Sequence, residues 1–423
     1  MTQDAALRPN ILVVHWHDLG THLSPYGVAV ESPAAQRLAD EGLVFDNWFA
    51  PTPLCSPARG ALWTGRYPHS NGLQGLTHRG WEYHDGERTL PMLLGDLGYH
   101  SCLIGLQHEA ADARRTGFAE IDELTPAHSG TVADKAIDWL AGHRDDEAPW
   151  LLTCGMTEVH RPWPHHRYRP ADPARVDVPA PLPDNELTRQ DIADYEGAIT
   201  LADRDLGRIL AALDALGLAA STLVVFVTDH GSPFPYAKST LYDAGVRVTM
   251  LLRPPAAWQV APRRIEDLAS HVDLVPTLLG LLGAEIPAGI QGVDLSDTIR
   301  GEASGLREEV FLEKTYHGEY DPIRAIRTRT HKYVINFESR PLLQLPTDLE
   351  ASLTRQGMGD DHLAERPAYE LYDLVTDPAE QHNLVDDPDQ VAVRDDLARR
   401  LDDFLRETGD PVLAGPIPDP QVE

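Results

Sequence analysis

The sequence predicts an α/β protein with a doubly wound, mostly parallel sheet flanked by helices, followed by a smaller C-terminal α+β subdomain with a short antiparallel sheet. Continuous apolar runs at residues 10–16 and 223–227 are typical of strands that are buried on both faces of a sheet. Strand and helix patterns alternate up to about residue 300, which favours a parallel sheet with helical crossovers. We therefore expect a larger domain over residues 1–305 and the subdomain over residues 306–423.

The individual elements follow from local periodicity. Strand patterns in the larger domain occur at residues 10–16, 43–49, 101–106, 150–154, 223–227 and 248–252. Helical patterns occur at residues 32–39, from Cys55 onward, and at residues 90–97, 131–143, 187–218 and 274–282. Residues 162–183 are rich in proline, which is typical of a surface loop, and this loop could cover a site. In the subdomain, short strands are expected at residues 310–314, 325–329, 332–337 and 370–374, with a helix at residues 391–405.

Composition restricts the partners and the compartment. The chain has 66 acidic against 36 basic residues, a formal net charge of −30, which argues against nucleic acid or an anionic membrane as a partner. An anionic substrate would therefore need local cations in its site. The three cysteines Cys55, Cys102 and Cys154 are too few for a disulfide framework and fit a reducing compartment. Residues 1–9 lack the apolar core of a signal peptide, so we expect a cytoplasmic protein.

Cys55 lies at the expected start of a helix. Ser56 can cap this helix, and Pro57 stands where its missing N–H costs nothing. The positive end of the helix dipole and the nearby Arg59 would favour the Cys55 thiolate. The alternative interpretation is a buried structural cysteine.

Polar side chains gather where the expected strands end. Open α/β sheets place their sites at the carboxyl ends of the strands, so these side chains are expected to meet there. Two carboxylates with one or two imidazoles form a typical divalent-cation site, which would neutralise an oxyanion and activate a nucleophile. The residues concerned are His17, Asp18, His108, His160, Asp229 and His230, with Lys238 shortly after the last pair.

The pattern Cys55-x-Pro57-x-Arg59, followed by Thr64-Gly65, resembles the maturation signature of type I sulfatases. These are the formylglycine-dependent sulfatases of the alkaline phosphatase superfamily, and the likeness implies an alkaline phosphatase-like fold. Further likenesses are His17-Asp18-Leu19-Gly20, Asp229-His230-Gly231, the segment after Lys238, Ser270–Thr277, Tyr369–Leu374 and Asp377–Leu384. Within the family, Asn71-Gly72-Leu73 and Pro233-Phe234-Pro235 are most similar to the heparan N-sulfatase (sulfamidase) branch.

The resemblance implies a role for each matching residue. A formylglycine-generating enzyme would oxidise Cys55 to formylglycine, and the hydrate of this aldehyde would attack sulfur. Arg59 would stabilise the hydrate, and His108 would take the proton of its second hydroxyl. His160 would bind the sulfate or protonate the leaving atom, and Lys238 would hold the sulfate and the leaving atom. These roles combine nucleophilic, acid–base and electrostatic catalysis.

The resemblance also implies one divalent cation. Its expected ligands are Asp18, Asp229, His230 and the residue made from Cys55, with His17 as the weakest candidate. Ca²⁺ is the first expectation, and Mn²⁺, Mg²⁺ or Zn²⁺ remain open. An imidazole at position 17 in place of a carboxylate favours softer ions such as Mn²⁺ or Zn²⁺.

Two departures from the family pattern bear on the substrate. His17 stands where most members have an acid, and Leu106-Gln107-His108 stands where most members have Lys-x-His, so that one sulfate-binding cation is missing. Gln107 itself, Arg79 or Arg161 could replace the missing cation. Further candidates for substrate contacts are Trp81, His317 and Arg324.

The sequence therefore predicts a sulfatase that cleaves a sulfate ester or a sulfamate of a sugar or small alcohol. Two alternatives stay open. One is a phosphonate monoester or phosphodiester hydrolase of the same superfamily. The other is a binding protein for anions or glycans whose Cys55 is never matured.

Overall fold

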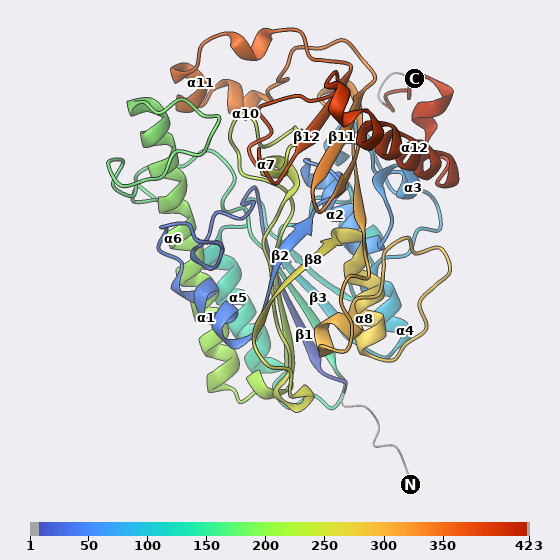
Figure 1. The fold of residues 1–423 in the computed structure, drawn as a ribbon. Helices are drawn as coiled ribbons and strands as arrows, with labels where there is room; N and C mark the ends of the chain where they lie inside the picture. Colours follow the sequence, from blue (N-terminus) through green and yellow to red (C-terminus); the bar gives the residue numbers. More distant parts are fainter. Residues whose placement is uncertain (1–7, 421–423) are drawn as a thin grey trace.

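The computed structural model describes residues 8–420. The expectation about a signal peptide concerns residues 1–9, most of which lie outside the described residues. A central sheet of eight strands is covered by helices on both faces, and a second sheet of four strands lies across its upper end (Figure 1). The strand order is β4-β3-β5-β1-β6-β7-β2-β8 in the central sheet and β12-β11-β10-β9 in the second. The predicted fold class is confirmed.

The strands and helices have the following bounds. The central sheet consists of β1 (Asn10–Trp16), β2 (Leu43–Phe49), β3 (His100–Gly105), β4 (Glu120–Glu123), β5 (Trp150–Gly155), β6 (Thr222–Thr228), β7 (Met250–Arg253) and β8 (Arg263–Ser270). The second sheet consists of β9 (Glu309–His317), β10 (Glu319–Thr328), β11 (His331–Asn336) and β12 (Tyr369–Asp373). The helices are α1 (Pro33–Glu41), α2 (Cys55–Thr64), α3 (Pro68–Asn71), α4 (Leu90–Asp96), α5 (Ser129–Gly142), α6 (Glu186–Ala215), α7 (Asp243–Val246), α8 (Leu274–Leu281), α9 (Ser296–Arg300), α10 (Thr347–Glu350), α11 (Leu353–Gly357) and α12 (Val391–Glu407).

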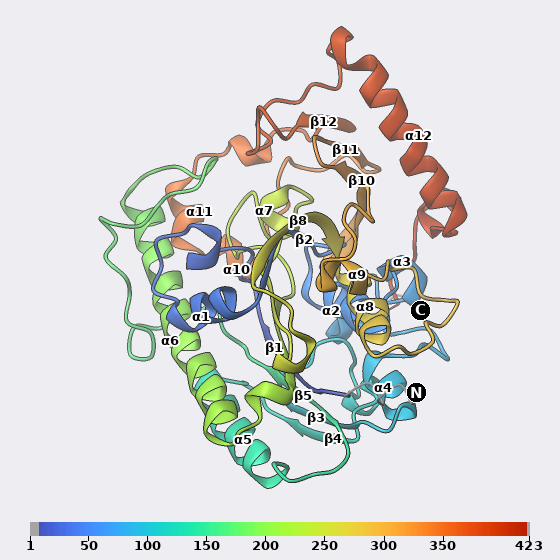
Figure 2. The same cartoon turned by 60° about the horizontal axis from the view of Figure 1, so that its bottom comes forward.

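The alternation of side chains along β1 explains the two-sided core. Leu12 and Val14 point to one face, where they pack among residues of α1, α5 and α6. Ile11 and Val13 point to the other face, where they pack among residues of α2, α4 and α8. Figure 2 shows these two helical layers on opposite sides of the sheet. The uninterrupted apolar runs of β1 and β6 follow from this burial on both faces.

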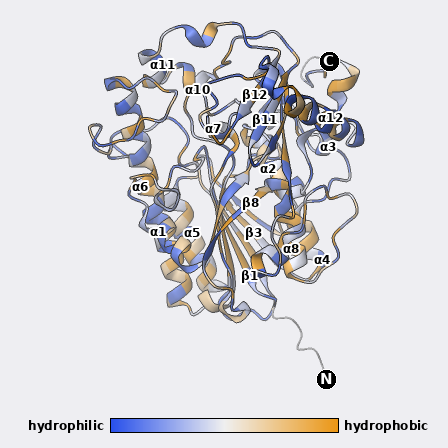
Figure 3. Cartoon of the chain, viewed as in Figure 1, coloured by the Kyte–Doolittle hydropathy of each residue, from blue (hydrophilic) through white to orange (hydrophobic). Residues whose placement is uncertain are grey.

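The second sheet is antiparallel and carries its own small core. Leu397 and Leu401 of α12 pack against Ile326 and Leu371 of the sheet. Val310 and other residues of β9, β10 and β11 form a further cluster with residues near β2 and β8, which joins the two sheets. Figure 3 shows apolar strands at the centre of the molecule and a largely hydrophilic α12 at its edge.

Some elements differ from the sequence expectation. The patterns missed β4 and β8, whose charged residues are typical of sheet edges rather than of buried strands. β7 runs antiparallel to β6 and to β2, although its apolar residues resemble those of a parallel strand. The proline-rich stretch contains no helix or strand, as expected, but Trp163, Tyr168 and Val176 anchor it in the core. No helix in residues 8–420 has the length and apolar character needed to cross a membrane.

Candidate active site

Two adjacent parallel strands bring the expected site together. β1 and β6 pair in register as far as Trp16 and Thr228, so the residues that follow each strand lie at the same edge of the sheet. His17 and Asp18 follow β1, and Asp229 follows β6 with His230 after it. The site therefore lies at the carboxyl ends of the central strands, which is where an open α/β sheet favours a ligand.

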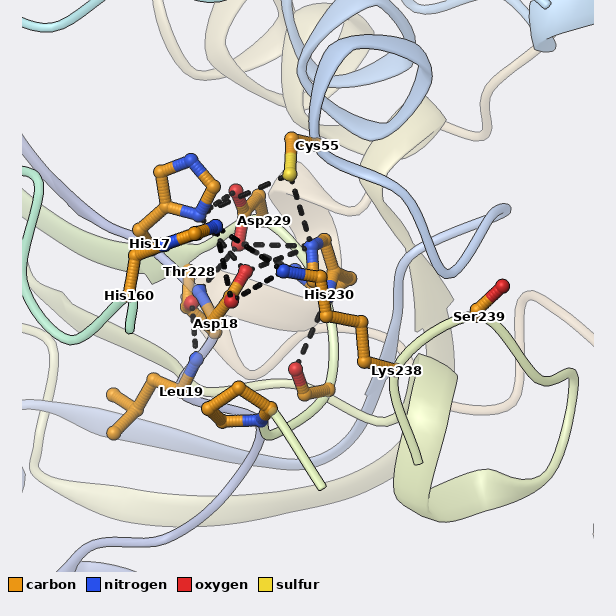
Figure 4. A network of polar contacts seen from close by, with 12 residues as sticks. His17, Asp18, Leu19, Cys55, His160, Thr228, Asp229, His230, Lys238 and Ser239 are labelled. Atoms are coloured by element: carbon orange, nitrogen blue, oxygen red, sulfur yellow. Dashed lines mark hydrogen bonds and ion pairs between the residues drawn. The ribbon is translucent and has the colours of Figure 1, made fainter. Parts of the chain in front are cut away.

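Two carboxylates and two imidazoles converge in this position (Figure 4). The Nδ1 atom of His17 lies 2.9 Å from Oδ1 of Asp18 and 3.2 Å from Oδ2 of Asp229. The Nε2 atom of His230 lies 3.0 Å from Oδ1 of Asp18 and 3.3 Å from Sγ of Cys55. One ligand atom from each of these five residues lies within 4.8 Å of the others, and all five are buried. His17, the weakest candidate ligand in the sequence, therefore belongs to the cluster.

Hydrogen bonds fix the orientation of the Asp229 carboxylate and the backbone position of Asp18. Oδ1 of Asp229 accepts hydrogen bonds from the backbone N–H groups of Asp18 and His230, at 2.9 and 2.8 Å. The hydroxyl of Tyr195 on α6 donates to the backbone oxygen of Asp18 at 3.1 Å. Asp18 itself has a positive φ of 53°, and a Cβ on Gly20, two residues later, would lie 3.1 Å from the backbone nitrogen of Ser232, three residues after Asp229. The two strand ends can thus approach closely, which places the carboxylates side by side.

The electrostatics of the cluster favour a cation. Burial alone would lower the pKa of His17, but Asp229, the Cys55 thiol and Asp18 outweigh it and raise the pKa to about 9. Burial would raise the pKa of Asp229, but His17, His230 and Arg59 hold it well below its usual range. Two ionised carboxylates thus share a buried space and attract positive charge. This donor set fits a divalent cation, because carboxylate oxygens and imidazole nitrogens are usual ligands of such ions.

Cys55 is the first residue of α2, with its Sγ on the cluster. Burial would raise the pKa of its thiol, but His17 and His230 lower it well below its ordinary value. The expected thiolate therefore depends chiefly on imidazoles. The expected Ser56 cap is wrong, because the helix begins at Cys55 and no side chain caps it. Instead, the Ser56 hydroxyl accepts a hydrogen bond from the backbone N–H of Thr77, which holds the following loop.

The other expected catalytic residues also surround the cluster. Arg59 is buried, and its Nε donates to Oδ2 of Asp229 at 3.3 Å. The Nζ atom of Lys238 donates to Oδ2 of Asp18 at 2.7 Å and lies 3.2 Å from Nε2 of His160. The ring of His108 lies 5.9 Å from that of His17, centre to centre. The cations, the imidazoles and the nucleophile position therefore share one site.

Of the residues expected to contact the substrate, His317 lies at the site, Arg79 is exposed, and the others are bound to other parts of the protein. The structure brings His317 to the site, where its Nδ1 lies 3.1 Å from Oγ of Ser239, next to Lys238. Burial, Lys238 and Lys314 lower the pKa of His317 to about 3, so its ring is neutral at neutral pH. Arg79 is exposed on the loop after α3.

The other candidates are engaged elsewhere. Gln107 donates to the backbone oxygen of Ala110 and accepts from the backbone N–H of the same residue, so its amide holds its own loop. Arg161 pairs with both oxygens of Asp191 at 2.7 Å. Arg324 is buried against Asp410, and Trp81 is buried in a small cluster with Leu73, Tyr83 and Tyr316. The structure therefore does not bring these four side chains into the site.

One residue of the site carried no sequence signal. Asp348, on the short helix α10, places Oδ2 2.9 Å from Nζ of Lys238. It belongs to the segment between β11 and β12, more than a hundred residues after Lys238, and no motif surrounds it. Only the folded chain reveals this contact.

Comparisons with known proteins agree with this geometry. The sulfatase family model matches residues 9–284, and a model described as N-sulphoglucosamine sulphohydrolase, C-terminal, matches residues 230–350. An ulvan-active sulfatase of Formosa agariphila is 25% identical, with 95% of this chain and 76% of that protein covered. Human N-sulphoglucosamine sulphohydrolase is 26% identical, with 92% of this chain and 88% of that protein covered.

Solved structures share the fold at low sequence identity. A protein in complex with its substrate D-glucosamine-2-N,6-O-disulfate has a TM-score of 0.75 at 18% identity, with 98% of this chain and 100% of that chain covered. The phosphonate monoester hydrolase of Agrobacterium radiobacter has a TM-score of 0.75 at 22% identity, with 96% and 97% covered. Because the sulfatase model matches well over half of the sequence, and the curated relatives are aligned along nearly all of it, this chain belongs to the sulfatase family of sulfuric ester hydrolases.

Proposed function

We propose that this protein is a formylglycine-dependent, metal-dependent sulfatase that hydrolyses a sulfate ester or a sulfamate of a sugar. The observation that carries the proposal is the position of Cys55. Its Sγ lies 3.3 Å from His230, inside a buried cluster of two carboxylates and two imidazoles. A nucleophile made from this residue would therefore stand beside a cation, in the same site as Lys238 and His160, which contact Asp18 of the cluster.

Two groups that the chain must acquire supply part of the chemistry. Formylglycine, formed by oxidation of Cys55 during maturation, supplies a hydrated aldehyde as the nucleophile. A divalent cation, held by Asp18, Asp229, His230 and His17, supplies positive charge next to the sulfate oxygens. Maturation makes a formylglycine-generating enzyme a partner of this chain.

The side chains of the chain itself bind and move protons. Lys238 is buried with its ammonium between Asp18 and His160, where it can hold a sulfate oxygen or the leaving atom. His160 is partly exposed, and burial, the largest effect on its pKa, lowers that pKa, so its ring favours the neutral form, which can accept a hydrogen bond or a proton in the site. Arg59 donates to Asp229 and so orients this carboxylate within the site. His108, near His17, is placed to take a proton from the nucleophile side.

The donor set bears on the identity of the cation. Ca²⁺ is the expectation from the family, and it prefers six to eight oxygen ligands. Here two of the four side chains are imidazoles, and His17 takes part in the cluster. Nitrogen donors favour Mn²⁺ or Zn²⁺ over Ca²⁺. We therefore propose Mn²⁺ or Zn²⁺ as a competitor of Ca²⁺ at this site, to be decided by metal analysis of the native protein.

The proposed substrate is a sulfated sugar. The names of two curated relatives state activity on ulvan and on N-sulphoglucosamine. A structural neighbour was solved in complex with a disulfated glucosamine. The match of the C-terminal model over residues 230–350 supports a sulfamate or an amino sugar in particular. The three cysteines are all free, which supports the proposed cytoplasmic location.

The test compares sulfate with phosphonate esters. Protein coproduced with a formylglycine-generating enzyme is assayed with 4-nitrophenyl sulfate, with a 4-nitrophenyl phosphonate monoester and with a panel of sulfated monosaccharides. We expect kcat/KM to be highest for a sulfated sugar. A higher value for the phosphonate would favour the phosphonate monoester or phosphodiester hydrolase. Binding of these anions without any turnover would favour a non-catalytic binder.

A further inference from the structure

We propose that Asp348 determines substrate specificity, by accepting a hydrogen bond from a hydroxyl or amino group that stands next to the scissile bond. This proposal rests on the proposed function, because it concerns the same site. It adds a substrate class to it, namely sugars with a free proton donor beside the sulfated position.

The carboxylate of Asp348 lies at the cluster although its helix belongs to another part of the fold. Its Oδ2 atom accepts a hydrogen bond from Nζ of Lys238 at 2.9 Å, and the same ammonium donates to Asp18 at 2.7 Å. One ligand atom each of Asp348, Asp18 and His160 lies within 4.8 Å of the other two. Asp348 is thus linked to the expected metal ligand Asp18 through the shared ammonium of Lys238.

Asp348 lies on the solvent side of this site. Its side chain is 22% exposed and that of His160 is 29% exposed, whereas Lys238 is 2% exposed and Asp18 is fully buried. A substrate that enters from solvent therefore meets Asp348 and His160 before its sulfate reaches Lys238. The part of the substrate that Asp348 contacts is consequently the part just outside the reacting group.

A buried ion pair holds the segment of Asp348 in place. Just after α10, the N–H and the hydroxyl of Thr354 on α11 donate to Oδ2 of Asp191, at 3.0 and 2.6 Å. Asp191 lies on α6 and pairs with Arg161, the neighbour of His160. Asn185, the cap of α6, donates to the backbone oxygen of Gly357 at 3.0 Å. Asp348 is therefore presented by a fixed segment, as a specificity contact requires.

The chemistry of a carboxylate decides which groups it recognises. An ionised carboxylate accepts hydrogen bonds and donates none, so it binds hydroxyl and amino groups. It repels a second sulfate or a carboxylate at the same position. It also competes with the sulfate anion for Lys238. Removing its charge should therefore have opposite effects on two ligands: weaker recognition of a sugar and stronger binding of free sulfate.

The experiment uses the matured full-length protein and two matched variants. Asp348→Asn removes the charge at the site, and Glu350→Gln removes the same charge from the same helix, where Glu350 is 51% exposed and only 3.5 Å from Arg355. The probes are N-sulfoglucosamine, 4-nitrophenyl sulfate, which has no neighbouring donor, and inorganic sulfate as an inhibitor.

For Asp348→Asn we expect kcat/KM for the sugar to fall about tenfold relative to the aryl sulfate, the usual effect of one charge-assisted hydrogen bond. The inhibition constant of sulfate should fall about threefold, because a like charge has been removed. Glu350→Gln should leave both quantities within about twofold. Equal losses for both substrates together with weaker sulfate inhibition would overturn the proposal, because a residue that only positions Lys238 would act in this way.

A binding experiment keeps the test independent of turnover. Calorimetry measures D-glucosamine, which carries no sulfate, binding to Cys55→Ala and to Cys55→Ala with Asp348→Asn. An affinity for D-glucosamine about tenfold lower in the double variant than in Cys55→Ala supports the proposal. If the matured protein releases no sulfate from any substrate, this result still supports the role of Asp348, and only the proposed function fails. Equal affinities of the two proteins would overturn the role of Asp348 whatever the turnover.

Discussion

Asp191 offers a sharp test of how the site is held together. Both of its carboxylate oxygens pair with the guanidinium of Arg161 at 2.7 Å, and Oδ2 also accepts two hydrogen bonds from Thr354. Arg161 is 8% exposed and Asp191 is 3% exposed, so the pair is almost completely withdrawn from water. The change Asp191→Ala would leave a buried guanidinium without its counter-charge.

The expected loss follows from that burial. Removing one partner of a buried ion pair typically costs about 3–5 kcal/mol in the free energy of unfolding, because the remaining charge stays desolvated. The rate should fall as well, since Asp191 links the segment of His160 to the segment of Asp348. Arg161 also stacks on Trp163 at 4.2 Å, so part of its packing survives the change.

Urea denaturation of the wild type and of Asp191→Ala measures this loss. Asp184→Ala is the matched control, because Asp184 pairs with Arg189 near the start of the same helix but is 59% exposed. The double variant Asp191→Ala with Arg161→Met should be more stable than Asp191→Ala alone, because no unpaired charge remains. An equal and small loss for Asp191→Ala and Asp184→Ala would refute the reasoning.

Three further predictions concern the site directly. Cys55→Ala should abolish turnover without changing the melting temperature, and substantial residual activity would contradict the nucleophile assignment. His17→Ala and Asp229→Ala should each lower the metal content measured by inductively coupled plasma mass spectrometry, and an unchanged stoichiometry for either would remove that residue from the ligand set. Gln107→Ala should leave KM for an aryl sulfate within about threefold, because its amide bonds to its own loop, and a much larger rise in KM would show that Gln107 contacts the sulfate.

The sequence predicts the central sheet well because its signals are local. The uninterrupted apolar run of β1 and the helical periodicity of α6 are visible within short stretches of sequence. The gathering of Asp18 and Asp229 follows from one topological rule about strand ends. These features therefore needed no knowledge of the tertiary structure.

Features that depend on distant side chains could not be read in this way. Ser56 has the composition of a helix cap, but a loop twenty-one residues later occupies its hydroxyl. Arg161 looks like an available cation, but Asp191, thirty residues later, takes its charge. Asp348 lies 110 residues from its partner Lys238. For Ser56 and Arg161 a tertiary contact overrides a plausible local preference, whereas the contact of Asp348 has no local signal at all.

The most direct test of the central claim is mass spectrometry of the peptide that contains Cys55, from protein produced in its native host and active on a sulfated sugar. The account predicts formylglycine at position 55, seen as loss of the thiol and gain of an aldehyde that reacts with a carbonyl reagent. An unmodified thiol in protein that still releases sulfate would contradict it, because the nucleophile would then have to lie elsewhere in the site.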